Sequence, residues 1–185
     1  MSGSVLCCFV TLRCWDSKLL VAYSSIVHMG ASTTGLLCGT TCSSTSALLA
    51  MVSHSLVSPV LFWAVTEIYC AHGSRRLLLH FNSSLSSAFI FLFCLLCGLN
   101  FGLPPFLGFW GEVFLFLGLG WSSLLLLALA LPIPFFVIAY SLVLLILSIG
   151  GKPGVVRYFY SPSWVPLCSV SLSFLASLAV SSFSY

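Results

Sequence analysis

Apolar residues form long runs along this chain, and only short polar breaks separate them. The runs lie at about 2–14, 19–38, 44–69, 85–119, 122–150 and 163–183. Most approach the length of about 20 residues that crosses a bilayer as an α-helix, whereas β-barrel strands are much shorter and alternate in polarity. The pattern therefore predicts an all-α membrane protein with about six transmembrane helices.

The composition agrees with a chain that is embedded in lipid. Hydrophobic residues make up 60% and charged residues 5% of the 185 residues, and the mean hydropathy is +1.18. So little polar surface cannot coat a soluble globule. The six Lys and Arg residues against three Asp and Glu are too few to form a nucleic-acid-binding surface. The opening segment has neither the amphipathic pattern of a transit peptide nor a cationic leader, so we interpret it as part of the mature protein.

Nine cysteines are scattered through the apolar sequence. Cys94 and Cys97 form a C-x-x-C pair inside a membrane run, but no second Cys or His pair follows at metal-ligand spacing. Because burial at low dielectric suppresses the reactive thiolate, the sequence predicts inert thiols and no metal site.

The run at 85–119 is too long for one continuous span, because a helix of this length would measure roughly 50 Å. It is either two spans or one broken span. Loops on one side of a membrane collect Lys and Arg, and a single crossing puts every basic residue of the chain on the same side. This favours one discontinuous helix. Pro104 and Pro105, just after Leu103, are the natural break, because proline lacks an N–H and clashes with the preceding turn.

His28, His54 and Glu112 are ionisable residues that lie well inside the predicted spans, away from their ends. A buried carboxylate anion is costly, so Glu112 either carries a proton or pairs with a cation. Imidazole titrates near neutrality and can accept and donate a proton, although a neutral histidine can also join helices through a hydrogen bond to serine. The presence of all three in one small bundle predicts a buried proton relay.

Three motifs occur in a fixed order: DSKLLVAYSSIVHMG, MVSHSLVSPVLF and NFGLPPFLGFWGE. Together they resemble the antiporter-like membrane-arm subunits of respiratory complex I, most closely the chain 4 group of NADH:ubiquinone oxidoreductase, over about residues 12–142. The glutamate supports chain 4, because chains 2 and 5 usually place a lysine at the equivalent position. Three positions depart from the family pattern: Ser55, Pro59 and Gly108. The matching positions are Asp16, Lys18, Ala22 to Ser25, His28, Met29, His54, Tyr69, Arg75, Asn100, Leu103, Pro104, Pro105, Gly111, Glu112, Trp121 and Ala139 to Leu142.

The resemblance implies a proton-translocating subunit of the NADH:ubiquinone reductase in the mitochondrial inner membrane, with no redox chemistry of its own. His28, His54 and Glu112 would belong to its proton route. Lys18 matches a family lysine near a helix start, where a side chain that reaches the membrane interface is the simpler interpretation. Flavin, iron–sulphur clusters and quinone would be bound by other subunits, and this chain would hold no cofactor. Its partners would be lipids and other membrane-arm subunits.

The resemblance also implies a domain organisation. Residues 1–150 would form the second five-helix repeat of an antiporter-like module, and residues 151–185 a loop and a terminal transmembrane helix. The first repeat, with the family's buried glutamate and its two buried lysines, matches no part of this sequence. We therefore expect a separately encoded N-terminal half of chain 4 as a partner.

Two other functions are compatible with the same helices. A subunit of the same complex could serve only as a scaffold, without passing protons. A membrane cytochrome could ligate haem between His28 and His54.

Overall fold

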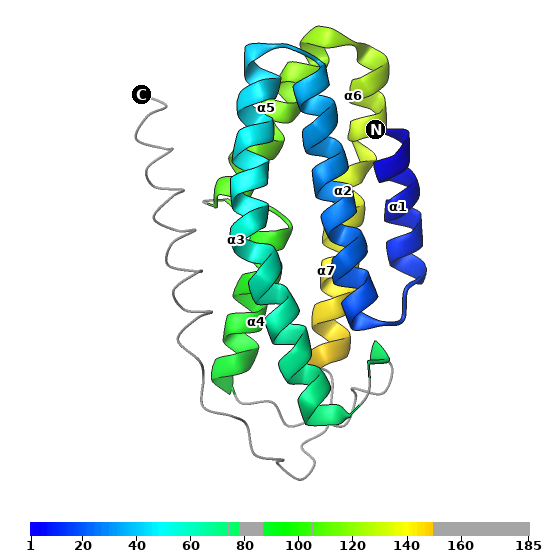
Figure 1. The fold of residues 1–185 in the computed structure, drawn as a ribbon, viewed down its shortest axis with the longest axis vertical. Helices are drawn as coiled ribbons and strands as arrows, with labels where there is room; N and C mark the ends of the chain where they lie inside the picture. Colours follow the sequence, from blue (N-terminus) through cyan, green and yellow to red (C-terminus); the bar gives the residue numbers. More distant parts are fainter. Residues whose placement is uncertain (74, 78–86, 105, 150–185) are drawn as a thin grey trace.

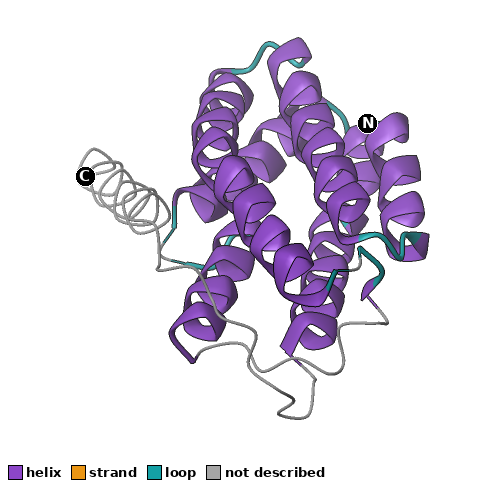
Figure 2. Cartoon of the chain, turned by 60° about the horizontal axis from the view of Figure 1, so that its bottom comes forward, coloured by secondary structure: helices purple, strands orange, loops and turns teal. Residues whose placement is uncertain are grey.

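The computed structural model describes residues 1–73, 75–77, 87–104 and 106–149 (Figure 1). In these residues the regular secondary structure is helical, and Figure 2 draws no strand there. The predicted span at 163–183, the predicted domain 151–185, Lys152 and Arg157 lie outside the described residues. The helices are α1 (Ser2–Arg13), α2 (Ser17–Leu37), α3 (Thr41–His72), α4 (Ser87–Asn100), α5 (Leu107–Ser122), α6 (Leu124–Ala130) and α7 (Pro132–Ile149).

The helices stand side by side along the long axis of the bundle (Figure 1). α3 packs against α2, α4 and α5, while α1 packs against α2 and α7. Two stretches, Thr41–Cys70 and Leu124–Ser148, are long and apolar enough to cross a membrane by themselves. The second runs through α6 and α7, which meet at Leu131, and Pro132 begins α7 at a position where its missing N–H costs nothing. The prediction of an all-α membrane bundle is confirmed.

The predicted discontinuous helix is present as α4 and α5. They have 14 and 16 residues, so each is about 21 to 24 Å long and too short to cross the hydrocarbon layer alone. In Figure 1, α4 lies in the lower half of the bundle and α5 in the upper half, both beside α3, so together they make one crossing.

The break between α4 and α5 includes Leu103 and Pro104, and Pro105 lies outside the described residues. Gly102 has a φ of 69°, a left-handed conformation that glycine adopts without strain. The Leu103 N–H donates to the Gly98 carbonyl, and the Phe106 N–H donates to the Leu103 carbonyl. These bonds pair part of the backbone that the helix ends would otherwise leave without partners.

Small residues allow α5 to approach α3 closely. A Cβ added at Gly111 would lie 3.2 Å from the Ala50 backbone nitrogen, and one at Gly118 would lie 2.7 Å from the Ser43 backbone nitrogen. Helices in lipid associate through this kind of close packing, because the hydrophobic effect does not drive them together. Glu112, next to Gly111, lines a pocket together with residues of α3.

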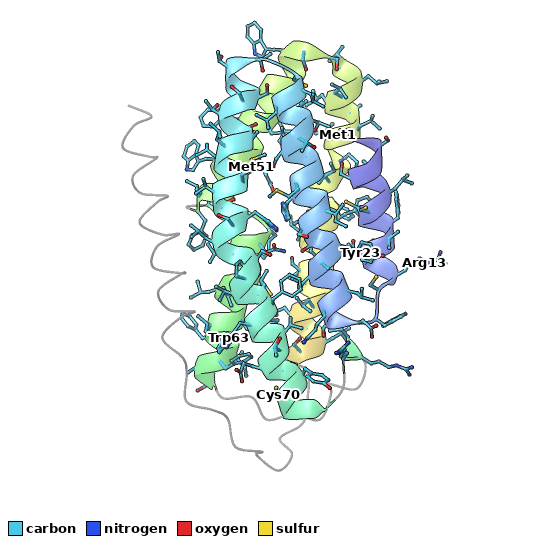
Figure 3. The ribbon with its side chains drawn as sticks, in the orientation of Figure 1. Met1, Arg13, Tyr23, Met51, Trp63 and Cys70 are labelled. Atoms are coloured by element: carbon cyan, nitrogen blue, oxygen red, sulfur yellow. The ribbon has the colours of Figure 1, made fainter. Side chains whose placement is uncertain are left out.

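The described basic residues gather at one end of the bundle, where α1 ends, α2 begins and α3 ends. Arg13 points away from the helices in Figure 3. The Lys18 Nζ and the Arg75 guanidinium carbon lie 5.4 and 5.5 Å from the centre of the Tyr69 ring, in cation–π contact. The backbones of Asp16 and Arg76 form an isolated antiparallel β-bridge. By the positive-inside rule, this end of the bundle therefore faces the side of the membrane where basic loops collect.

Candidate functional site

His28 on α2 and His54 on α3 face each other across the contact between these helices. Their ring centroids are 5.5 Å apart, with an angle of 33° between the ring planes. Both lie well inside their helices, and both residues are partly buried. Two imidazoles at this separation can pass a proton between them through one bridging water.

Glu112 on α5 lines two small pockets inside the bundle. The first has a volume of about 40 Å³, and its lining includes His28, Ser32, Ser46 and Phe116 in addition to Glu112. Its other lining residues are mostly apolar.

The second pocket has a volume of about 30 Å³ and is more polar. Its lining includes His28, His54, Ser53, Asn100 and Glu112. A water needs roughly 10 to 15 Å³ on this measure, so each pocket can hold at least one. Glu112 and His28 line both pockets and connect them.

The Glu112 carboxyl group lies over the break in the discontinuous helix. A Cβ added at Gly102 would lie 3.5 Å from both the Glu112 carboxyl carbon and its Oε1 atom. Gly102 therefore leaves the space that this carboxyl group fills. Sequence reasoning did not select Gly102, and its sequence signal is a glycine two residues before the proline pair.

Tyr140 on α7 lies in the matching stretch Ala139 to Leu142, but the sequence analysis did not assign it to the site. Its hydroxyl lies 3.3 Å from His28 Nε2, and its side chain is 1% exposed. Tyr140 therefore joins α7 to α2 at the level of His28.

The structure thus brings His28, His54 and Glu112 together at the helix break and keeps Lys18 apart from them. Lys18 lies at the start of α2, ten residues and about 15 Å of helix away from His28. In the described part of the chain, no group of three or more His, Cys, Asp or Glu could hold a metal ion. Pockets of 30 to 40 Å³ are about ten times smaller than those that hold drug-sized ligands, so a haem does not fit between the two histidines.

Comparisons with known proteins match the chain to one family. Residues 1–136 match the family described as NADH:quinone oxidoreductase/Mrp antiporter, TM. The NADH-ubiquinone oxidoreductase chain 4 of Anopheles arabiensis is 38% identical over 164 residues, which cover 86% of this chain and 72% of that protein. The proteins of the same name from Artemia franciscana and Caenorhabditis elegans are also 38% identical, over 64% and 81% of this chain.

The chain spans about a third of these last two relatives, 31% of the Artemia protein and 36% of the Caenorhabditis protein. A chain of the respiratory complex I from Thermus thermophilus with bound NADH has a similar fold, with a TM-score of 0.80 and 24% sequence identity. That match covers 94% of this chain and 37% of the other.

Proposed function

Because the chain belongs to the NADH:quinone oxidoreductase/Mrp antiporter transmembrane family, we propose that it is a proton-translocating membrane-arm subunit of respiratory complex I. The observation that carries this proposal is the meeting of His28, His54 and Glu112 at one water-sized pocket beside a helix break, with a second such pocket next to it. Broken helices at membrane depth typically form ion sites in transporters. The animal chain 4 relatives support the mitochondrial inner membrane as its location.

The residues of this chain would bind and pass protons and take no part in electron transfer. Glu112 would hold a proton that it exchanges, through water in the second pocket, with His54 and His28. NADH oxidation and quinone reduction would take place in other subunits, which hold the flavin, the iron–sulphur clusters and the quinone. That distant reaction would drive the relay by changing its proton affinities, a coupling between separate sites.

His54→Ala tests this function in the intact complex. The change removes one relay group, so the number of protons pumped per NADH oxidised should fall, while transfer from NADH to a soluble artificial acceptor should stay unchanged. Ser55→Ala is the matched control, because the Ser55 hydroxyl donates only to the Val52 carbonyl in its own helix. A wild-type ratio in His54→Ala complexes in proteoliposomes would favour a scaffold role without pumping.

A separately encoded N-terminal half of chain 4 is the proposed partner. Neither pocket beside Glu112 has a Lys or Arg among its lining residues in the described part of the chain. An unpaired carboxylate at this depth is expensive, and a lysine from a neighbouring helix set would balance its charge. The partner would supply at least one intramembrane Lys and one intramembrane Glu.

Photo-crosslinking from Met51 tests this partner. Met51 lies one turn before His54 on α3, so the two side chains share a face of the helix. A photoreactive residue there should capture a polypeptide with membrane-embedded lysines. The same residue at Leu125, which is 74% exposed on α6, should capture lipid or other subunits. Capture at Met51 of lipid alone, or of a subunit without such lysines, would contradict the proposal.

A further inference from the structure

Two buried serines that line the first pocket have already committed their hydroxyl hydrogens. Ser32 lies on α2 and Ser46 on α3, and each is 1% exposed. The Ser32 hydroxyl donates to the His28 carbonyl at 2.9 Å. The Ser46 hydroxyl donates to the Ser43 carbonyl at 2.6 Å. A hydroxyl has one hydrogen and two acceptor lone pairs, so toward the pocket both oxygens can only accept.

A carbonyl at the junction of α6 and α7 adds another acceptor. Ala130 and Pro134 both line the first pocket. A helical carbonyl normally accepts from the N–H four residues later, but Pro134 has no N–H to donate to the Ala130 carbonyl. The other polar side chains of this pocket are His28 and Glu112, and His28 Nε2 already faces the Tyr140 hydroxyl at 3.3 Å. Acceptors therefore dominate the polar lining of the first pocket.

The protonation state of Glu112 decides how a water can pair in this pocket. A buried water typically makes about three hydrogen bonds, two of them as donor. When Glu112 is protonated, its O–H donates to the water oxygen, and the water donates to Ser32 and Ser46. When Glu112 is charged, it is one more acceptor, and the water must turn a hydrogen away from one serine to reach it. The charged state therefore has one hydrogen bond fewer.

We infer that Ser32 and Ser46 are positioning residues that hold a water in the first pocket, where it accepts the hydrogen of protonated Glu112. The second pocket differs because its lining includes donors. The Asn100 side-chain amide offers N–H groups, and the His54 ring can carry a proton. A charged Glu112 can be hydrogen-bonded from that side. The two pockets thus favour different protonation states of the same carboxyl group.

The serines also give the relay a direction. Ser32 lies in the C-terminal half of α2 and Ser46 near the start of α3, so both lie toward the end of the bundle where α2 meets α3. The described basic residues gather at the opposite end, where α2 begins and α3 ends (Figure 1). This inference rests on the proposed proton relay and deepens it, because Glu112 would hold its proton on the side away from the basic end.

Ser32→Ala and Ser46→Ala test the inference in the intact complex reconstituted into liposomes. Each change removes one acceptor, and each hydroxyl donates only within its own helix, so the helices stay intact. A water hydrogen then becomes free for the charged carboxylate, and Glu112 should hold its proton about fivefold less tightly, the factor for one hydrogen bond. As the pH is raised, pumping through this chain should therefore be lost about 0.7 pH unit earlier than in the wild type.

The other titratable groups around Glu112 are unchanged in these variants. Across the two pockets it faces His28 on α2 and His54 on α3, and α4, α6 and α7 contribute no titratable lining residue in the described part of the chain. A shift of the pH profile in both serine variants is therefore assigned to Glu112.

Ser25→Ala on α2 and Ser44→Ala on α3 are the matched controls. Each hydroxyl donates within its own helix, and neither residue lines these pockets. Both controls should keep the wild-type pH profile. An unchanged profile in either test variant, or lower pumping at every pH without a shift, would overturn the inference. Glu112→Gln distinguishes the two proposals, because lowered pumping in that variant leaves the proton relay intact, whereas wild-type pumping would show that the proposed function itself is wrong.

Discussion

Replacing Glu112 by glutamine is expected to leave the subunit assembled in its complex while slowing proton transfer through this chain by about 100-fold. Glutamine has nearly the shape of the protonated carboxyl group and can make similar hydrogen bonds, so it fits the space over Gly102. It cannot release and rebind a proton. Glu112 lines both pockets beside the helix break, so its loss should interrupt the route at the residue that connects them.

The measurement for this variant is the number of protons pumped per NADH oxidised in proteoliposomes. The ratio should fall to the value that the remaining channels of the complex sustain. Glu67→Gln is the matched control, because Glu67 lies on α3 toward the basic end of the bundle and lines neither pocket. If Glu112→Gln complexes kept the wild-type ratio, this chain would be a scaffold.

The elements of this fold that depend on local sequence were predictable. The proline pair in an overlong apolar run predicts a broken crossing, and the structure has one between Asn100 and Leu107. The resemblance to the antiporter-like subunits, drawn from three motifs, is confirmed by the family match over residues 1–136. These predictions succeed because each rests on a property of a single segment, its length, its prolines or its motif.

The contacts between segments were less accessible to sequence reasoning. His28 and His54 belong to different helices, and their pairing depends on how each helix is rotated about its axis. Tyr140 belongs to the matching stretch Ala139 to Leu142 but was not assigned to the site, because only the fold places its hydroxyl beside His28. Gly118 was missed because the need for glycine there comes from the Ser43 backbone, far away in the sequence.

Gly118→Ala is expected to destabilise the bundle by about 3 kcal/mol. The new Cβ would lie 2.7 Å from both the backbone nitrogen and the Cβ of Ser43, and 2.9 Å from its Cα. A backbone cannot move aside as a flexible side chain does, so α5 would have to shift away from α3. Glu112 is on the same helix less than two turns away, and the shift should also misplace its carboxyl group and lower pumping.

Gly120→Ala on the same helix is the matched control for this change. A Cβ there would meet only Leu127 Cδ2, at 3.9 Å, an ordinary van der Waals contact. In both variants alanine favours the helix over glycine by up to about 1 kcal/mol, so helix propensity alone predicts that both are more stable. The purified complex can be unfolded by titration with a denaturing detergent. Gly118→Ala should unfold at a lower detergent concentration than the wild type, and Gly120→Ala at an equal or higher concentration. Equal midpoints for the two variants would mean that the close approach of α5 to Ser43 does not hold the bundle together.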